Sequence, residues 1–181
     1  MIAALITASA SILIALIAYL MNHRGEIQRS SHQAQLEWVN SQPRELYGPL
    51  LVLSETNERS WKAFRAKYLP PQSERIPESR LSSPDRERWS RWVSSSFAPS
   101  AQKMRDMILE HGDLIIEDDI PDIVLEFCAH ASSYDTRVVS NDTLGTEDDL
   151  LIRHPGNDFL NYVRASYRDL KNRQAILMKS R

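Results

Sequence analysis

The stretch from Ile2 to Met21 contains 20 consecutive residues without a charge. A helix rises about 1.5 Å per residue, so roughly 20 apolar residues match a bilayer hydrocarbon core about 30 Å thick. Every charged side chain of the sequence follows this stretch, beginning with Arg24. The sequence therefore predicts a transmembrane anchor at residues 1–22, to which the rest of the chain is tethered.

Two alternatives to an anchor are a cleavable signal peptide and a buried core helix. A signal peptide needs a basic start and small residues at its cleavage site. Residues 1–11 contain no Lys or Arg, and the bulky residues Tyr19-Leu20-Met21 end the apolar run. Because Arg24 and Arg29 follow the span, the positive-inside rule predicts a single-pass protein of the inner (plasma) membrane with a cytoplasmic C-terminal domain.

Small residues recur every fourth position along one face of the anchor: Ala3, Thr7, Ser11 and Ala15. This spacing lets two helices approach closely, and the hydroxyl groups can hydrogen-bond across the contact. In the alternative interpretation the hydroxyls bond only to their own helical turn. We expect the lipid bilayer to be one partner, and the protein to form a homo-oligomer or a larger membrane complex.

Composition limits what the rest of the chain can be. The 181 residues, 42% hydrophobic and 25% charged, leave enough sequence after the anchor for one globular domain. The only cysteine, Cys128, excludes an internal disulfide and agrees with a reducing cytoplasm. A net charge of −2 provides no general attraction to nucleic acid, so no nucleic-acid partner is predicted.

Apolar residues after the anchor recur at three- and four-residue steps, and alternation with a period of two is absent. Residues 23–42 are polar enough to form a helical stalk or linker, and 43–181 form the domain. We expect helices at 43–69, 83–112, 121–134 and 159–177, with connections at 70–83 and 140–157. The predicted fold is an all-α cytoplasmic bundle of about four main helices, with Trp61, Phe64, Trp89, Phe127 and Tyr167 largely buried.

Prolines mark the expected helix boundaries. Ser41 is a candidate N-cap, with Pro43 in the first turn of a new helix, and Pro99 should kink or break the helix that contains it. Gly48-Pro49 interrupts a strong apolar stripe. Either the helix begins near Pro49 and 43–48 is a turn, or a kink is kept there for packing or movement.

Charge is unevenly distributed along the domain. No Lys or Arg occurs from Asp106 to Asp135, whereas the flanking segments are basic. Such runs are commonly solvated faces or pair within the fold. They can also dock a surface of opposite charge on another protein. The candidate partner surface consists of Glu117, Asp118, Asp119 and Asp122.

Residue types that carry chemistry are few. Cys128 and His130 stand two positions apart, so on a helix they point to different faces and cannot act as nucleophile and base. His111 and His130 are metal-ligand types, but no metal-binding motif contains them. Phosphate-binding and hydrolase motifs are also missing from the sequence. We therefore predict no catalytic residues, no metal site and no cofactor.

Several short motifs can be weighed together: LYGPLL, W-x-x-F-R, HGDLI, LEFCAHASSY and HP-x-x-x-FLNY. With them the chain resembles uncharacterised bacterial single-pass membrane proteins that have an N-terminal anchor and a helical body. The resemblance implies a bacterial source and this architecture, and it supplies no reaction. We expect a non-enzymatic membrane-anchored interaction module, an accessory subunit or scaffold acting through protein–protein association. The alternative is a membrane effector or sensor of a bacterial defence or stress system whose anchors oligomerise to perturb the membrane.

Overall fold

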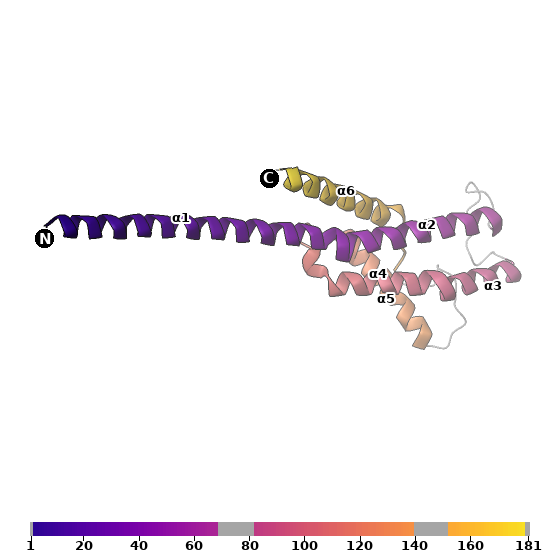
Figure 1. Ribbon diagram of the computed structural model, residues 1–181. Helices are drawn as coiled ribbons and strands as arrows, with labels where there is room; N and C mark the ends of the chain where they lie inside the picture. Colours follow the sequence, from indigo (N-terminus) through magenta and orange to yellow (C-terminus); the bar gives the residue numbers. More distant parts are fainter. Residues whose placement is uncertain (1, 69–81, 140–151, 180–181) are drawn as a thin grey trace. The chain divides into compact units, whose positions relative to one another are not determined.

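The computed structural model describes residues 2–68, 82–139 and 152–179, and for 2–13 and 136–139 it describes the backbone alone. Within these ranges the regular elements are helices and no strand occurs, which confirms the predicted all-α class (Figure 1). Most of the two connections predicted at 70–83 and 140–157 lies outside the described residues.

The chain divides into two units, Met1–Asn40 and Ser41–Arg181. Helix α1 (Ile2–Ser41) accounts for the first unit, so the predicted stalk is helical up to Ser41. Across the part of the chain that the structure describes, none of the helices combines the length and the apolar character needed to cross a membrane.

The second unit is a helical body. Its elements are η1 (Gln42–Tyr47), α2 (Gly48–Tyr68), α3 (Ser83–Trp92), η3 (Val93–Phe97), α4 (Ala98–Glu110), η4 (Gly112–Leu114), α5 (Asp122–Val139) and α6 (Asn157–Lys179). Helix α2 packs against both α4 and α6, and α5 also packs against α4 and α6. With α3 and α4 continuous through η3, this arrangement matches the predicted bundle of about four main helices.

Two predicted helix starts are confirmed. Helix α3 begins at Ser83, and the Ser82 side chain accepts a hydrogen bond of 3.4 Å from the backbone N–H of Asp85, as an N-cap residue does. Helix α5 follows Pro121, whose carbonyl accepts the first backbone hydrogen bond, from Val124 N–H at 2.9 Å. Proline is well suited to this place because its missing N–H is not needed there.

At Pro43 the predicted helix start is wrong, whereas the predicted interruptions at Pro49 and Pro99 coincide with π-helical turns. Ser41 has helical dihedral angles (φ −67°, ψ −39°) and makes no capping hydrogen bond, so no helix starts at Pro43. Residues 42–47 form a π-helix rather than a turn, and Gly48 N–H donates to the carbonyl of Pro43, five residues earlier. A second π-helical segment, η3, precedes Pro99. In it Ala98 N–H donates to the carbonyl of Val93, again five residues earlier.

One physical reason explains the π-helical turns that precede Pro49 and Pro99. A proline ring clashes with the carbonyl four residues earlier in an α-helix. A π-helical turn holds one more residue than an α-helical turn, which displaces that carbonyl. The helix therefore passes through Pro49 and Pro99 without breaking.

The core of the body lies between α2, α4, α5 and α6. Phe127 is completely buried, with its ring stacked on Phe159 at a centroid distance of 4.0 Å. Phe64 and Trp89 are also buried, as predicted. Trp61 and Tyr167, which were expected in the core, are only partly buried and pack against it.

Candidate functional site

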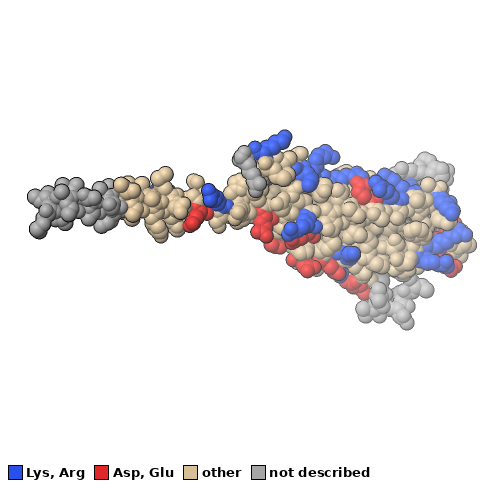
Figure 2. All heavy atoms as spheres, viewed as in Figure 1, with Lys and Arg blue, Asp and Glu red and all other residues tan. Residues whose placement is uncertain are grey.

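The four predicted partner residues, Glu117, Asp118, Asp119 and Asp122, lie together between η4 and the first turn of α5, and all four are exposed. We call these four residues the acidic surface. The positive end of the α5 helix dipole favours negative charge at this position. Figure 2 shows that acidic side chains gather along one edge of the body, and basic side chains gather mainly on the other.

The acids at the two ends of the 106–135 stretch are neutralised within the fold. Arg105, which directly precedes the stretch, forms ion pairs with Asp106 at 2.9 Å and with Asp135. By contrast, in the described part of the chain Asp118 and Asp119 form no ion pair, and neither does Asp122. The acidic surface therefore keeps its negative charge.

A network of hydrogen bonds holds the segment that carries the acidic surface. The Tyr162 hydroxyl donates to Glu117 Oε2 at 3.0 Å, and the hydroxyls of Tyr47 and Tyr162 lie 2.9 Å apart. Tyr47 also accepts from the backbone N–H of Ile116 at 3.2 Å. Burial raises the pKa of both tyrosines, so both hydroxyls stay protonated at neutral pH.

The polar residue Gln42 makes a second attachment. It is completely buried in η1, and its Nε2 donates to the carbonyl of Leu114 at 3.1 Å. The π-helix thus sends two side chains, Gln42 and Tyr47, to the segment from 114 to 117. Tyr47 belongs to the LYGPL motif, for which the sequence alone gave no role. Through Tyr47 the motif helps to position the acidic surface.

The residues predicted to associate the anchors, Ala3, Thr7, Ser11 and Ala15, all lie on α1. The side chains of Ala3, Thr7 and Ser11 lie outside the described residues, and Ala15 is exposed. Association of the anchors through these four residues therefore stays a prediction.

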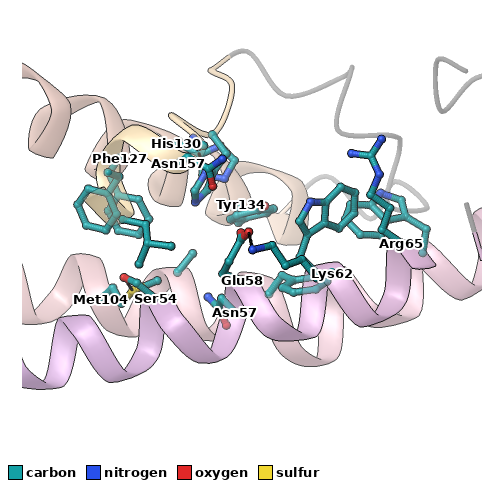
Figure 3. A pocket seen from close by; sticks show the side chains of 18 residues that line it. Ser54, Asn57, Glu58, Lys62, Arg65, Met104, Phe127, His130, Tyr134 and Asn157 are labelled. Carbon is teal, nitrogen blue, oxygen red and sulfur yellow. Dashed lines mark hydrogen bonds and ion pairs between the residues drawn. The ribbon is translucent and has the colours of Figure 1, made fainter. Parts of the chain in front are cut away.

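A cavity of about 600 Å³ lies within the body and is the second candidate site (Figure 3). One wall is a face of α2 that carries Ser54, Asn57, Glu58, Trp61, Lys62 and Arg65. These positions recur at three- and four-residue steps, so they lie on one side of the helix. The volume is in the range of small-molecule sites, about 300–1,000 Å³.

The opposite walls come from α4, α5 and the start of α6. They include Met104, Phe127, His130, Tyr134, Asn157 and Phe159. Most of these residues are buried, whereas Asn157 and Lys62 are exposed. The cavity is therefore apolar at its inner end and polar at its mouth.

Charge at the mouth is only partly compensated. Lys62 Nζ lies 3.0 Å from Glu58 Oε1, one turn away on α2. Arg65, half-buried one turn after Trp61, makes no ion pair within the described residues. A guanidinium without a carboxylate partner is suited to bind an anion.

His130 is the least expected residue of the cavity. Its ring is completely buried, and Nδ1 lies 2.9 Å from the carbonyl of Ile152, to which it must donate. The other nitrogen, Nε2, is therefore an unprotonated acceptor, and it is buried without a hydrogen-bond partner among the described residues. Burial lowers the pKa of His130. The indole Nε1 of Trp89 is likewise a buried donor for which the described part of the chain offers no acceptor.

His154 stands beside His130, with the two ring centroids 4.9 Å apart. Its Nδ1 accepts from the backbone N–H of Gly156 at 2.8 Å. The pKa of His154 is lowered, first by desolvation where the ring packs against its neighbours and then by the proximity of His130. Sequence reasoning placed His154 in a connection and gave it no role.

Cys128 is a packing residue in the structure. Cys128 is half-buried against the core, and burial raises the pKa of its thiol, which disfavours the nucleophilic thiolate. Among the described residues, no group of three or more His, Cys, Asp or Glu side chains is arranged to hold a metal ion.

Comparisons with protein-family models, with curated proteins and with solved structures find no match to this chain. The resemblance to bacterial single-pass membrane proteins therefore stays a prediction.

Proposed function

We propose that this chain is a membrane-anchored interaction module that acts by protein–protein association rather than by catalysis. The anchor at residues 1–22 rests on the uncharged length of Ile2–Met21, and the cytoplasmic side rests on Arg24 and Arg29. The module is an accessory subunit or scaffold that holds its partner at the inner membrane.

The acidic surface is the observation that carries the association proposal. Placing several carboxylates side by side costs electrostatic free energy because like charges repel. The fold nevertheless fixes them with the Tyr47–Tyr162 network and leaves Asp118, Asp119 and Asp122 without ion pairs in the described chain. Exposed Ile120 and Leu125 lie among these acids and add apolar area. Such a surface suits a partner whose binding face is basic with apolar residues between the charges.

A topology experiment tests the first half of the proposal. A reporter that works only in the cytoplasm, fused after Arg181, should be active, and the chain should stay in the membrane fraction after alkaline extraction. The thiol of Cys128 should be shielded from membrane-impermeant reagents in intact cells. Activity of a periplasmic reporter, or release by alkali, would overturn the proposed topology.

Cross-linking in native membranes tests the second half. We expect discrete species, either homo-oligomers or one larger complex, because an anchor confines the chains to two dimensions and raises their effective concentration. A chain that stays monomeric at every cross-linker concentration would refute association.

A second candidate function is favoured by the cavity. A membrane effector or sensor of a bacterial defence or stress system needs a place to bind its signal, and a cavity of about 600 Å³ is large enough for one. In that case the anchors would oligomerise in response to the ligand and perturb the membrane.

A further inference from the structure

We infer that the cavity between α2, α4, α5 and α6 binds a small planar heteroaromatic anion, the chemistry of a mononucleotide. The inference goes beyond association through the acidic surface and does not depend on it. It rests on three features of the lining, namely aromatic faces, a guanidinium without an ion pair to any described residue, and a buried donor and acceptor without partners among those residues.

The aromatic lining favours a flat ligand. Trp61 is half-buried on the cavity wall, and its ring is held edge-on to Trp89 at a centroid distance of 5.2 Å and stacked with Phe64 at 6.4 Å. Its orientation is thus fixed before any ligand arrives. Tyr134 and Phe97 line the same cavity. Aromatic side chains bind planar rings by stacking, largely irrespective of which ring is presented.

The mouth favours an anion. Glu58 neutralises Lys62 through the 3.0 Å ion pair, which leaves Arg65 as the positive charge that this wall does not compensate. A guanidinium presents a planar fork of N–H donors that matches phosphate and carboxylate groups. Arg65 follows Trp61 by four residues, so the anion site lies one helical turn from the stacking ring.

Two buried polar atoms of lining residues favour a heteroaromatic ring over an aliphatic chain. His130 Nε2 needs a donor and Trp89 Nε1–H needs an acceptor, and neither has one in the structure. A nucleobase-like ring carries both kinds of group along its edge, whereas the tail of a fatty acid carries neither. Both nitrogens are closed to water, so a bound ring has to shift lining side chains slightly to reach them.

Binding is measured by isothermal titration calorimetry on the full chain in detergent. The probes are adenosine 5′-monophosphate and guanosine 5′-monophosphate, with adenosine, inorganic phosphate and decanoate as partial mimics. We expect at least one nucleotide to bind at least tenfold more tightly than each partial mimic, since only a nucleotide meets both the aromatic wall and Arg65. Binding of phosphate or decanoate as tightly as both nucleotides, or binding of no nucleotide at millimolar concentration, would overturn the inference.

Matched variants locate the site. Arg65→Gln should weaken nucleotide binding at least tenfold and leave adenosine binding nearly unchanged. Arg59→Gln, on the same helix but exposed and outside the cavity lining, should leave both unchanged. Equal losses in the two variants would contradict the assignment of the anion to Arg65.

A variant of His130 tests the proposed contact between the ligand and the buried Nε2. His130→Asn keeps a donor where Nδ1 meets the Ile152 carbonyl but removes Nε2, so nucleotide affinity should fall while inorganic phosphate binding does not change. Trp61→Leu provides a second test in case His130→Asn fails to fold, and it should weaken both nucleotide and adenosine. Unchanged nucleotide affinity in folded Trp61→Leu protein would overturn the stacking role and with it the proposed ligand class.

Discussion

The carbonyl oxygen of Pro43 lies 2.4 Å from the point where a β-carbon on Gly48 would sit. The same oxygen accepts the hydrogen bond from Gly48 N–H that closes the π-helical turn. Glycine is therefore required at this position by the close approach of the backbone, and the Gly-Pro pair is a packing device of the helix rather than its end.

The first prediction concerns this contact. Gly48→Ala should destabilise the body by about 1–3 kcal/mol, because the added methyl group must push the Pro43 carbonyl away. Urea unfolding of the full chain in detergent, followed by circular dichroism, measures the effect. Gly112→Ala is the control, since nothing lies within 4 Å of its added carbon, and it should change stability far less. Equal losses for the two variants would refute the steric explanation.

The second prediction concerns the tyrosine network. Tyr47→Phe removes the acceptor of Ile116 N–H and the hydroxyl partner of Tyr162, so it should cost about 1–3 kcal/mol. Tyr162→Phe should cost less, because Glu117 is exposed and water can replace the lost donor. Chemical denaturation of both variants checks the order. A larger loss for Tyr162→Phe than for Tyr47→Phe would mean that the network is not anchored at Tyr47.

The third prediction concerns the core. Phe127→Ala should cost about 3–5 kcal/mol, because it removes a completely buried ring that stacks on Phe159. Leu125→Ala, two positions away on the exposed side of α5, should be nearly neutral, since the Leu125 side chain is 50% exposed. Thermal unfolding of the two variants makes the comparison, and a neutral Phe127→Ala would contradict the packing of α5.

The fourth prediction concerns pH. Burial lowers the pKa of His130 below its value in the unfolded chain, so the unfolded state binds more protons once the pH falls below about 6.5. This contribution to stability is present at pH 7.5 and is lost as the pH falls through 6 toward the folded-state pKa. His154 acts in the same direction but more weakly, because its exposed surface lets water screen the charge. Urea midpoints at pH 7.5 and pH 5 should differ, and the difference should shrink in His130→Asn.

The sequence allowed the helices to be predicted where apolar periodicity and local caps agree. Helix α5 after Pro121 and helix α6 at 157–179 are examples, and burial of Phe64, Trp89 and Phe127 followed from the same pattern. Pro43 misled, because local rules interpret a proline after a candidate N-cap residue as a helix start. A π-helical turn that accommodates the ring depends on the packing of the whole body and leaves no local signal.

The two candidate sites differed in how far they could be predicted. The acidic surface is a run of neighbouring residues, so composition alone located Asp118 and Asp119. The cavity combines side chains of α2, α3, α4, α5 and α6, and His154 enters it from a segment that periodicity could only describe as a connection. The buried Nε2 of His130, which has no hydrogen-bond partner among the described residues, can be recognised only when the packing around it is known.

The measurement that tests association most directly is cross-linking of the full chain in native membranes at increasing salt. The body contact is tested by Asp118→Lys combined with Asp119→Lys, and the anchor contact by Ser11→Leu. The matched control is Glu87→Lys combined with Asp169→Lys, which changes net charge equally. It affects two exposed acids, each of which forms an ion pair with an arginine of its own helix.

If the acidic surface binds the partner, the cross-linked species should fade in the Asp118/Asp119 variant and at high salt, which screens charge, and should persist in the control. If Ser11→Leu abolishes the cross-linked species and salt does not change it, the contact lies in the anchor. Persistence of the same cross-linked species in the Asp118/Asp119 variant at every salt concentration would contradict a role for the acidic surface in association.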